Sequence, residues 1–152
     1  MSLKLTGQMR HTTAPEDREF LDAFEACEVA PEAFDHAAHV RLAYIYLCGH
    51  SVESAVLCMK DALLAFLTHL GVGHGKYHET ITRAWIMAVA HFMNESIPCD
   101  SAATFMARNP RLLDSKIMLS HYSAEVLFSP EARQTFVQPN VQAIPEHGKS
   151  EA

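Results

Sequence analysis

The sequence predicts an all-α protein, a single-domain bundle of about six helices with an extended C-terminal tail. Apolar residues recur at spacings of three and four along most of the chain, which is typical of helices that pack one face against a core. Capping residues precede these stretches, and no alternating run of β-branched residues is bounded by hairpin turns. The chain has 152 residues, the length of one domain. We therefore expect 1–152 to form a single helical domain whose segments 1–12 and 146–152 are flexible.

Three predicted helices fill the first half of the chain. The first covers about 14–28 and opens with the capping-box sequence TAPE. The second begins near Asp35, its N-cap, and ends at Gly49. The third has the sequence VESAVLCMKDALLAFLTHL, lies between Ser51 and Gly71, and is the longest predicted element.

The second half of the chain is predicted to hold shorter elements. The glycine-rich segment GVGHG indicates a turn, and a fourth helix follows over about 77–94. Asp100 caps a short fifth helix, which an Asn-Pro pair ends. The stretch RLLDSKIMLSHYSAEVLF is either a sixth helix or two short pieces broken near Ser123. After Phe136 the spacing of two prolines favours an extended surface tail.

Charge and cysteine patterns exclude several classes of protein. The chain has 12 basic and 18 acidic residues and no run of Lys or Arg, so we expect no nucleic-acid partner. Charges interrupt every long apolar stretch, which argues against a membrane span. The four cysteines lack a CxxC spacing and suit free thiols in a reducing compartment, so we expect a cytoplasmic protein. Nucleotide-binding, α/β-hydrolase and zincin motifs are absent from the sequence.

Histidine is the residue type that suggests chemistry, with ten copies against six glycines. In the second predicted helix, His36 and His39 share one stripe with apolar residues, so both imidazoles are expected to point inward. Residues three apart on a helix are close enough for two imidazole nitrogens to bind one metal ion. In the fourth predicted helix His78 also lies on the apolar stripe. In the sixth, if it is continuous, Asp114 and His121 fall on one side.

Two hypotheses for function follow from this convergence. The first is an internal metal or small-molecule site, as in a small metalloenzyme, whose metal ligands are His36, His39, His78 and His121. Imidazole ligands suit Zn, Fe, Ni or Cu, and the metal would polarise an oxygen atom or activate water, with Glu125 or Tyr77 as the catalytic acid or base.

The second hypothesis is a non-catalytic helical interaction or oligomerisation module. In this case each buried histidine is structural and pairs with a backbone carbonyl or a carboxylate. The apolar segment between Ala62 and Leu70 is consistent with a homo-oligomer.

Several sequence blocks resemble a family of small uncharacterised bacterial helical proteins. The blocks are FDHAAHVRLAYIYL, KYHETITRAWIMAVA and NPRLLDSKIMLSHYSAEVLFSPEAR, followed by VQPNVQAIP. The resemblance implies no particular activity. It implies that the motif positions of the family include His36, His39, Arg41, Tyr77, His78, Thr80, Thr82, Asp114, His121 and Tyr122. Where the first block of the family carries a charged residue, this chain has Ala38.

Overall fold

The computed structural model describes residues 11–145, and all regular secondary structure in this range is helical, which confirms the predicted helical class. The α-helices are α2 (Pro15–Glu25), α3 (His36–Gly49), α4 (Val52–Leu70), α5 (Glu79–Glu95), α6 (Ala102–Arg108), α7 (Ala124–Leu127) and α8 (Pro130–Gln134). The short 3-10 helices are η1 (Pro31–Ala33), η2 (His74–Lys76), η3 (Pro110–Leu113) and η4 (Ser115–Ser120). The flexibility expected for 1–10 and 146–152 lies outside the described residues.

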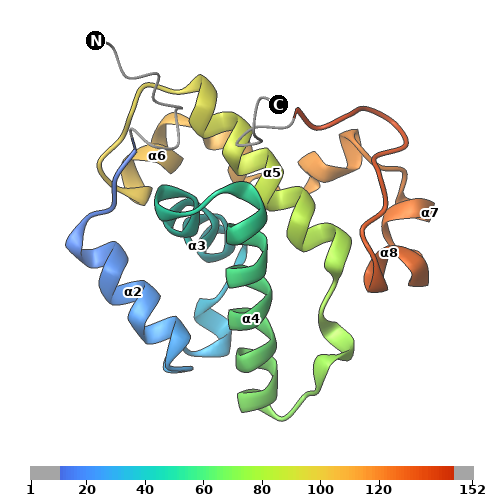
Figure 1. Ribbon diagram of the computed structural model, residues 1–152, viewed down its shortest axis with the longest axis horizontal. Coiled ribbons are helices and arrows are strands. Elements are labelled where there is room, and N and C mark those ends of the chain that lie inside the picture. Colours follow the sequence, from blue (N-terminus) through green and yellow to red (C-terminus); the bar gives the residue numbers. More distant parts are fainter. Residues whose placement is uncertain (1–10, 146–152) are drawn as a thin grey trace.

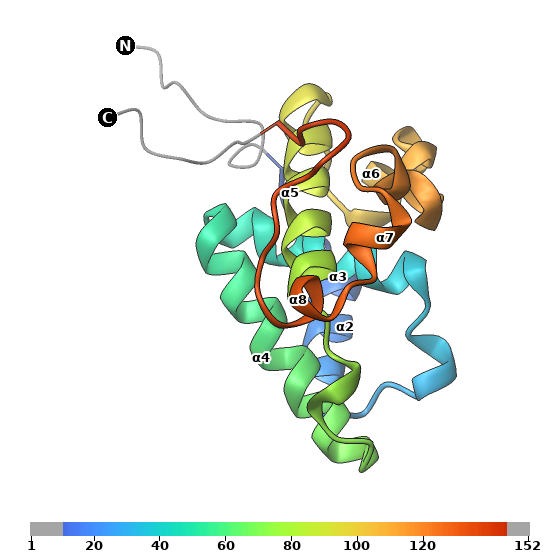
Figure 2. The same ribbon diagram turned by 90° about the vertical axis from the view of Figure 1, so that its right-hand side faces the viewer.

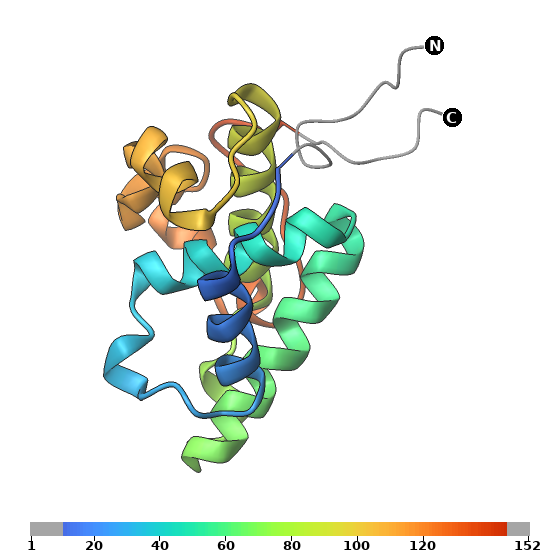
Figure 3. The ribbon, with the colours of Figure 1, turned by 90° about the vertical axis from the view of Figure 1, so that its left-hand side faces the viewer.

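Helices α3, α4 and α5 pack on one another and form the centre of the fold (Figure 1). Helix α8 packs on α5, beside the C-terminal segment (Figure 2). Helix α2 lies against α3 and α4 on the opposite side of the molecule (Figure 3). The arrangement differs from the predicted six-helix bundle, because most elements after α5 are single turns. Within 11–145 no helix is both long and apolar enough to cross a membrane.

Helix α3 is buried on more than one face. Val40 and every residue of 42–47 are buried, and only Arg41 interrupts this run. A helix that is apolar all round belongs inside the core rather than on its surface. Tyr44 illustrates this placement, because its ring stacks on Phe105 of α6 with centroids 4.8 Å apart. The side chains of α3 therefore meet neighbours on several sides.

A buried carboxylate joins α2, α3 and α6. Asp17 is 1% exposed, and its Oδ2 accepts hydrogen bonds from the backbone N–H groups of Ala14 and Ala102, each at 3.0 Å. Its Oδ1 lies 3.3 Å from Nε of Arg41. The predicted capping box is displaced by one residue, since Ala14 is the N-cap and Asp17 holds the third helical position. A buried charge needs such partners to offset its desolvation.

The continuous form of the predicted sixth helix is wrong. Its sequence forms η3, η4 and α7, with new starts at two capping side chains. Asp114 Oδ1 accepts from the backbone N–H of Lys116 at 3.0 Å, and Ser123 Oγ accepts from that of Val126 at 3.2 Å. Such short side chains compete with helix continuation by binding nearby backbone groups. The break at Ser123 agrees with the alternative of two shorter pieces.

The segment after Phe136 contains no helix up to residue 145 and lies along the core through hydrogen bonds. Thr80 is fully buried, donates to the carbonyl of Thr135 at 2.9 Å and accepts from the backbone N–H of Val137 at 3.0 Å. The hydroxyl of Tyr122 donates to the carbonyl of Val137. Two buried side chains therefore fix the position where this segment leaves α8.

We predict that Asp17→Ala lowers the free energy of unfolding by about 3 to 5 kcal/mol, because it removes the ion-pair partner of Arg41 and the acceptor of two backbone N–H groups, one of them buried. Glu16→Ala is the matched control, since its side chain is exposed in the same turn. Urea denaturation followed by circular dichroism measures both. Equal loss of stability in the two variants would contradict the role assigned to Asp17.

Candidate functional site

His78 is the N-cap of α5 rather than a residue inside it. Its Nδ1 accepts a hydrogen bond from the backbone N–H of Ile81 at 3.1 Å, and its Nε2 lies 2.8 Å from the carbonyl oxygen of Leu127. A carbonyl can only accept, so the bonding pattern assigns the proton to Nε2 and leaves the imidazole neutral. Burial lowers the pKa of His78, consistent with this state. Neither nitrogen is left for a metal.

His36 and His121 also bind backbone carbonyls. Nε2 of His36 lies 2.9 Å from the oxygen of Leu112, and its ring packs against Trp85 with centroids 4.6 Å apart. Nδ1 of His121 lies 2.7 Å from the oxygen of Gln142. In each case the nitrogen must carry a proton in order to donate. The other ring nitrogen of each residue is then the only one that could bind a metal, and an N–H bonded to a carbonyl is compatible with such a role.

The four predicted metal ligands do not come together as a site for a transition metal, because they are not grouped around one position and both nitrogens of His78 are engaged. Three of them direct a ring N–H at separate backbone carbonyls, of Leu112, Leu127 and Gln142. Among residues 11–145, no group of three or more His, Cys, Asp or Glu side chains is placed to hold a metal ion. The geometry instead agrees with the structural alternative for His36, His78 and His121.

His39 is the exception among the four. Its Nε2 is buried and has no hydrogen-bond partner, and within the described part of the chain no other buried side-chain nitrogen or oxygen lacks one. Burial, with a smaller contribution from the positive charge of His36, lowers the pKa of His39 from 6.5 to about 4. The imidazole is therefore neutral at pH 7. Such an unpaired buried group costs about 1 to 3 kcal/mol and requires an explanation.

A cavity of about 330 Å³ lies beside this imidazole, and we call it the His39 cavity. Residues of α3, α4, α5 and the η2 turn line it, and it is open to solvent on one side. Its lining is mostly apolar and consists of Phe34, His39, Leu63, Phe66, Leu67, Lys76, Tyr77, His78, Ile81 and Thr82. An apolar cavity with a few polar groups is the usual form of a small-molecule site.

Tyr77 lies in this lining, but its environment disfavours a role as a base. Burial raises its pKa above the ordinary value of 10, and the nearby carboxylate of Glu79 acts in the same direction. The hydroxyl donates to Glu79 Oε1 at 3.0 Å. Glu125, the other predicted catalytic residue, is exposed in the first turn of α7 and does not line the cavity. The structure therefore brings His39, Tyr77 and His78 together and leaves Glu125 apart.

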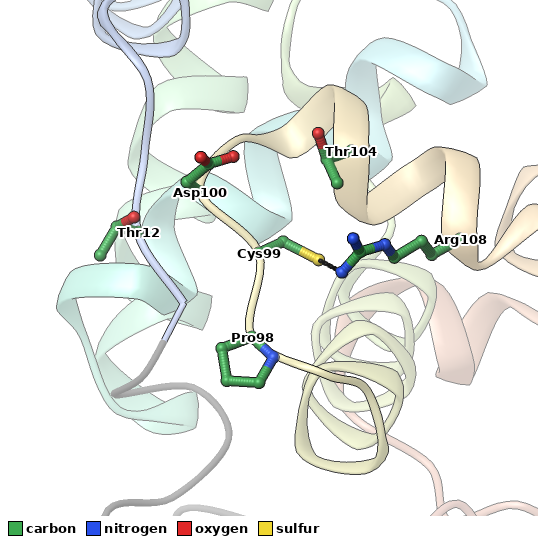
Figure 4. Close-up of a pocket in the computed structure, with 6 residues that line it drawn as sticks. All are labelled: Thr12, Pro98, Cys99, Asp100, Thr104 and Arg108. Atoms are coloured by element: carbon green, nitrogen blue, oxygen red, sulfur yellow. Dashed lines mark hydrogen bonds between the residues drawn. The ribbon is translucent and has the colours of Figure 1, made fainter.

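In two other pockets, polar side chains of the lining bind each other. A pocket of about 270 Å³ surrounds Cys99, whose Sγ accepts from Nη1 of Arg108 at 3.8 Å (Figure 4). A wider groove of about 830 Å³ runs between α2, the end of α3 and α4. There the hydroxyl of Tyr46 donates to Glu25 Oε2 at 2.6 Å, and burial raises the pKa of the Cys48 thiol to about 12. Neither pocket contains an unpaired buried group comparable to His39 Nε2.

Sequence reasoning missed one buried histidine. His11 is 1% exposed, its Nε2 lies 2.8 Å from the oxygen of Met93, and its Nδ1 accepts from the backbone N–H of Cys99 at 3.0 Å. It precedes the first helix, so no periodic pattern indicates its burial. The flexibility expected for 1–12 does not describe His11, which is held in the core.

Comparison with known proteins adds no relative. No protein-family model, curated protein or solved structure matches the chain. The resemblance to a bacterial helical family stays a prediction, and the argument about function depends on the geometry of the site.

We predict that stability falls as the pH drops from about 6.5 towards 4. In this window the unfolded chain binds a proton at His39 that the folded protein excludes, so the free energy of unfolding changes by up to about 1.4 kcal/mol per pH unit. His78, whose pKa is also lowered, adds to the same trend. Above pH 6.5 both groups are neutral in either state and this contribution is complete.

Urea denaturation at a series of pH values measures this slope. His39→Phe removes the contribution of His39 and should flatten the slope, whereas His69→Phe, a change at an exposed position of α4, should not. An unchanged slope in His39→Phe would contradict the lowered pKa.

Proposed function

We propose that the protein binds a small, largely apolar molecule in the His39 cavity and holds it by a hydrogen bond to His39 Nε2. The observation that carries this proposal is the buried Nε2 atom without a partner. A ligand that supplies the missing partner would recover part of the 1 to 3 kcal/mol that the unpaired atom costs. The cavity volume of about 330 Å³ lies within the range of small-molecule sites.

The chemistry of His39 indicates which ligand group would bind it. A neutral imidazole nitrogen is a donor in one tautomer and an acceptor in the other, and a hydroxyl group can pair with either. The rings of Phe34 and Phe66 and the side chains of two leucines would contact the rest of the molecule. An apolar molecule with one hydroxyl group is therefore the best match.

Binding without turnover is the form of this function that we favour. No carboxylate or thiol lines the cavity, and the Tyr77 hydroxyl keeps its proton at neutral pH. General acid–base catalysis needs a group whose pKa lies near the working pH. The proposal thus takes the internal small-molecule site from the metalloenzyme hypothesis and the absence of catalysis from the hypothesis of a helical interaction module.

The metalloenzyme hypothesis has less support. A site built on His36, His39, His78 and His121 would require His78 to give up one of its two hydrogen bonds, and the four side chains are not grouped in the structure. The binding of Zn, Fe, Ni or Cu stays a prediction from the sequence. Homo-oligomerisation likewise stays a prediction from the apolar stretch of α4.

We predict that 2-naphthol binds more tightly than naphthalene, by a factor of about three to ten, because only 2-naphthol offers a hydroxyl to His39. Isothermal titration calorimetry of both compounds gives the ratio. His39→Leu should reduce the ratio to about one while naphthalene still binds. His69→Leu is the matched control and should keep the ratio of the wild type. A ratio that His39→Leu does not change would contradict the proposal.

We predict that chelation leaves the melting temperature unchanged. A bound metal stabilises only the folded protein, by about 2.7 kcal/mol at a hundredfold excess over its Kd, so its removal would lower the melting temperature measurably. Thermal melts of untagged protein with and without EDTA make the comparison. A lower melting temperature after chelation, absent in His36→Ala, would favour the metalloenzyme hypothesis instead.

A further inference from the structure

We propose that the ligand of the His39 cavity is a small organic carboxylate, whose apolar body lies inside and whose anionic group lies beside Lys76 at the rim. This inference rests on the proposed function, since it names the class of molecule that the same cavity binds. It does not follow from His39, because a neutral imidazole has no preference for an anion over a hydroxyl group.

Lys76 is the first basis for the inference. Of the residues that line the cavity, only Lys76 carries a charge at neutral pH, because the pKa values of His39 and His78 are lowered. Its side chain is exposed and forms no ion pair with any residue of 11–145. An ammonium group at the edge of an apolar cavity is available to a ligand anion, and partial exclusion of water strengthens their attraction.

A second positive group lies next to Lys76. Nη1 of Arg133, on α8, donates to the carbonyl oxygen of Gly75 at 3.3 Å. The guanidinium group is close enough to contribute to the lowered pKa of His78, which lines the same cavity. The first turn of α5 also lines the cavity, and a helix N-terminus attracts negative charge. Lys76 and Arg133 therefore place two positive charges at the η2 turn, which lines the cavity.

The carboxylates near this rim are already paired. Glu79 accepts from the Tyr77 hydroxyl and lies 3.5 Å from Nζ of Lys60. Glu53 forms two hydrogen bonds with Arg83, at 2.8 and 2.9 Å. Lys60 and Arg83 therefore neutralise their own partners, and the charges of Lys76 and Arg133 are left without an opposing carboxylate. The excess positive charge favours a monoanion over a neutral ligand or an amine.

A matched pair of probes tests the charge separately from the cavity. 2-Naphthol measures the proposed function, and 6-hydroxy-2-naphthoate adds only the carboxylate. We expect the naphthoate to bind about two to five times more tightly than 2-naphthol at low salt, and this advantage to diminish as NaCl is added. Lys76→Gln should abolish the advantage, so that the two compounds bind with about equal affinity. Lys116→Gln, a change at an exposed position of η4, should leave both affinities unchanged.

The outcomes separate the two proposals. If 2-naphthol binds but the naphthoate binds no more tightly, or keeps its advantage in Lys76→Gln, the inference about the carboxylate is wrong and the proposed function stands. If neither compound binds, both are wrong. Because Lys76 is exposed and makes no ion pair in the described part of the chain, Lys76→Gln should fold like the wild type, which its melting temperature checks.

Discussion

Hydrogen bonds from the imidazole N–H groups of His36 and His78 to distant backbone carbonyls attach the irregular C-terminal part of the chain to the helical core. The acceptors lie in η3 and α7, where short elements leave many carbonyls without partners inside a helix. Within the irregular part, His121 binds the carbonyl of Gln142 in the same way. A single-turn helix buries too little apolar surface to hold its own position. The histidines on α3 and at the start of α5 therefore supply what helix packing supplies elsewhere. At His78 and His11 both ring nitrogens are engaged, which requires the neutral imidazole.

The sequence predicts which way these side chains point better than it predicts which groups they bind. Helical periodicity correctly places His36, His39 and His78 toward the interior, since a stripe of 3.6-residue period defines which side of a helix faces the core. It says nothing about which carbonyl faces them, because that depends on where a segment dozens of residues away crosses the helix. His78 is an example. It is the N-cap of α5, and this role depends on the backbone direction just before the helix, which periodicity does not describe. Convergence of side chains was therefore insufficient evidence for a metal.

Asp114 and His121 do not share one side of a helix, and the reason here is different. A 3-10 helix advances 120° per residue instead of 100°, so residues aligned on an α-helix separate when the chain forms 3-10 turns. Asp114 starts the 3-10 helix η4 by accepting from the backbone N–H two residues ahead, and Ser123 starts α7 by accepting from the N–H three residues ahead. The capping chemistry was visible in the sequence, yet the apolar spacing of the stretch favoured a continuous helix. Local hydrogen bonds outweighed periodicity here.

His39 differs from the other buried histidines in one physical respect. No hydrogen bond within the described part of the protein offsets the desolvation of its Nε2 atom. The paired histidines offset their desolvation with hydrogen bonds, whereas His39 Nε2 is desolvated and unpaired. A leucine at this position would fill similar space at lower cost, so packing alone does not account for the imidazole. Groups that lower stability in this way are concentrated at functional sites, where a ligand completes the missing interaction. The positive charge of Lys76 then adds a preference for an anion among the molecules that fit, and this preference is modest because the ammonium group is exposed.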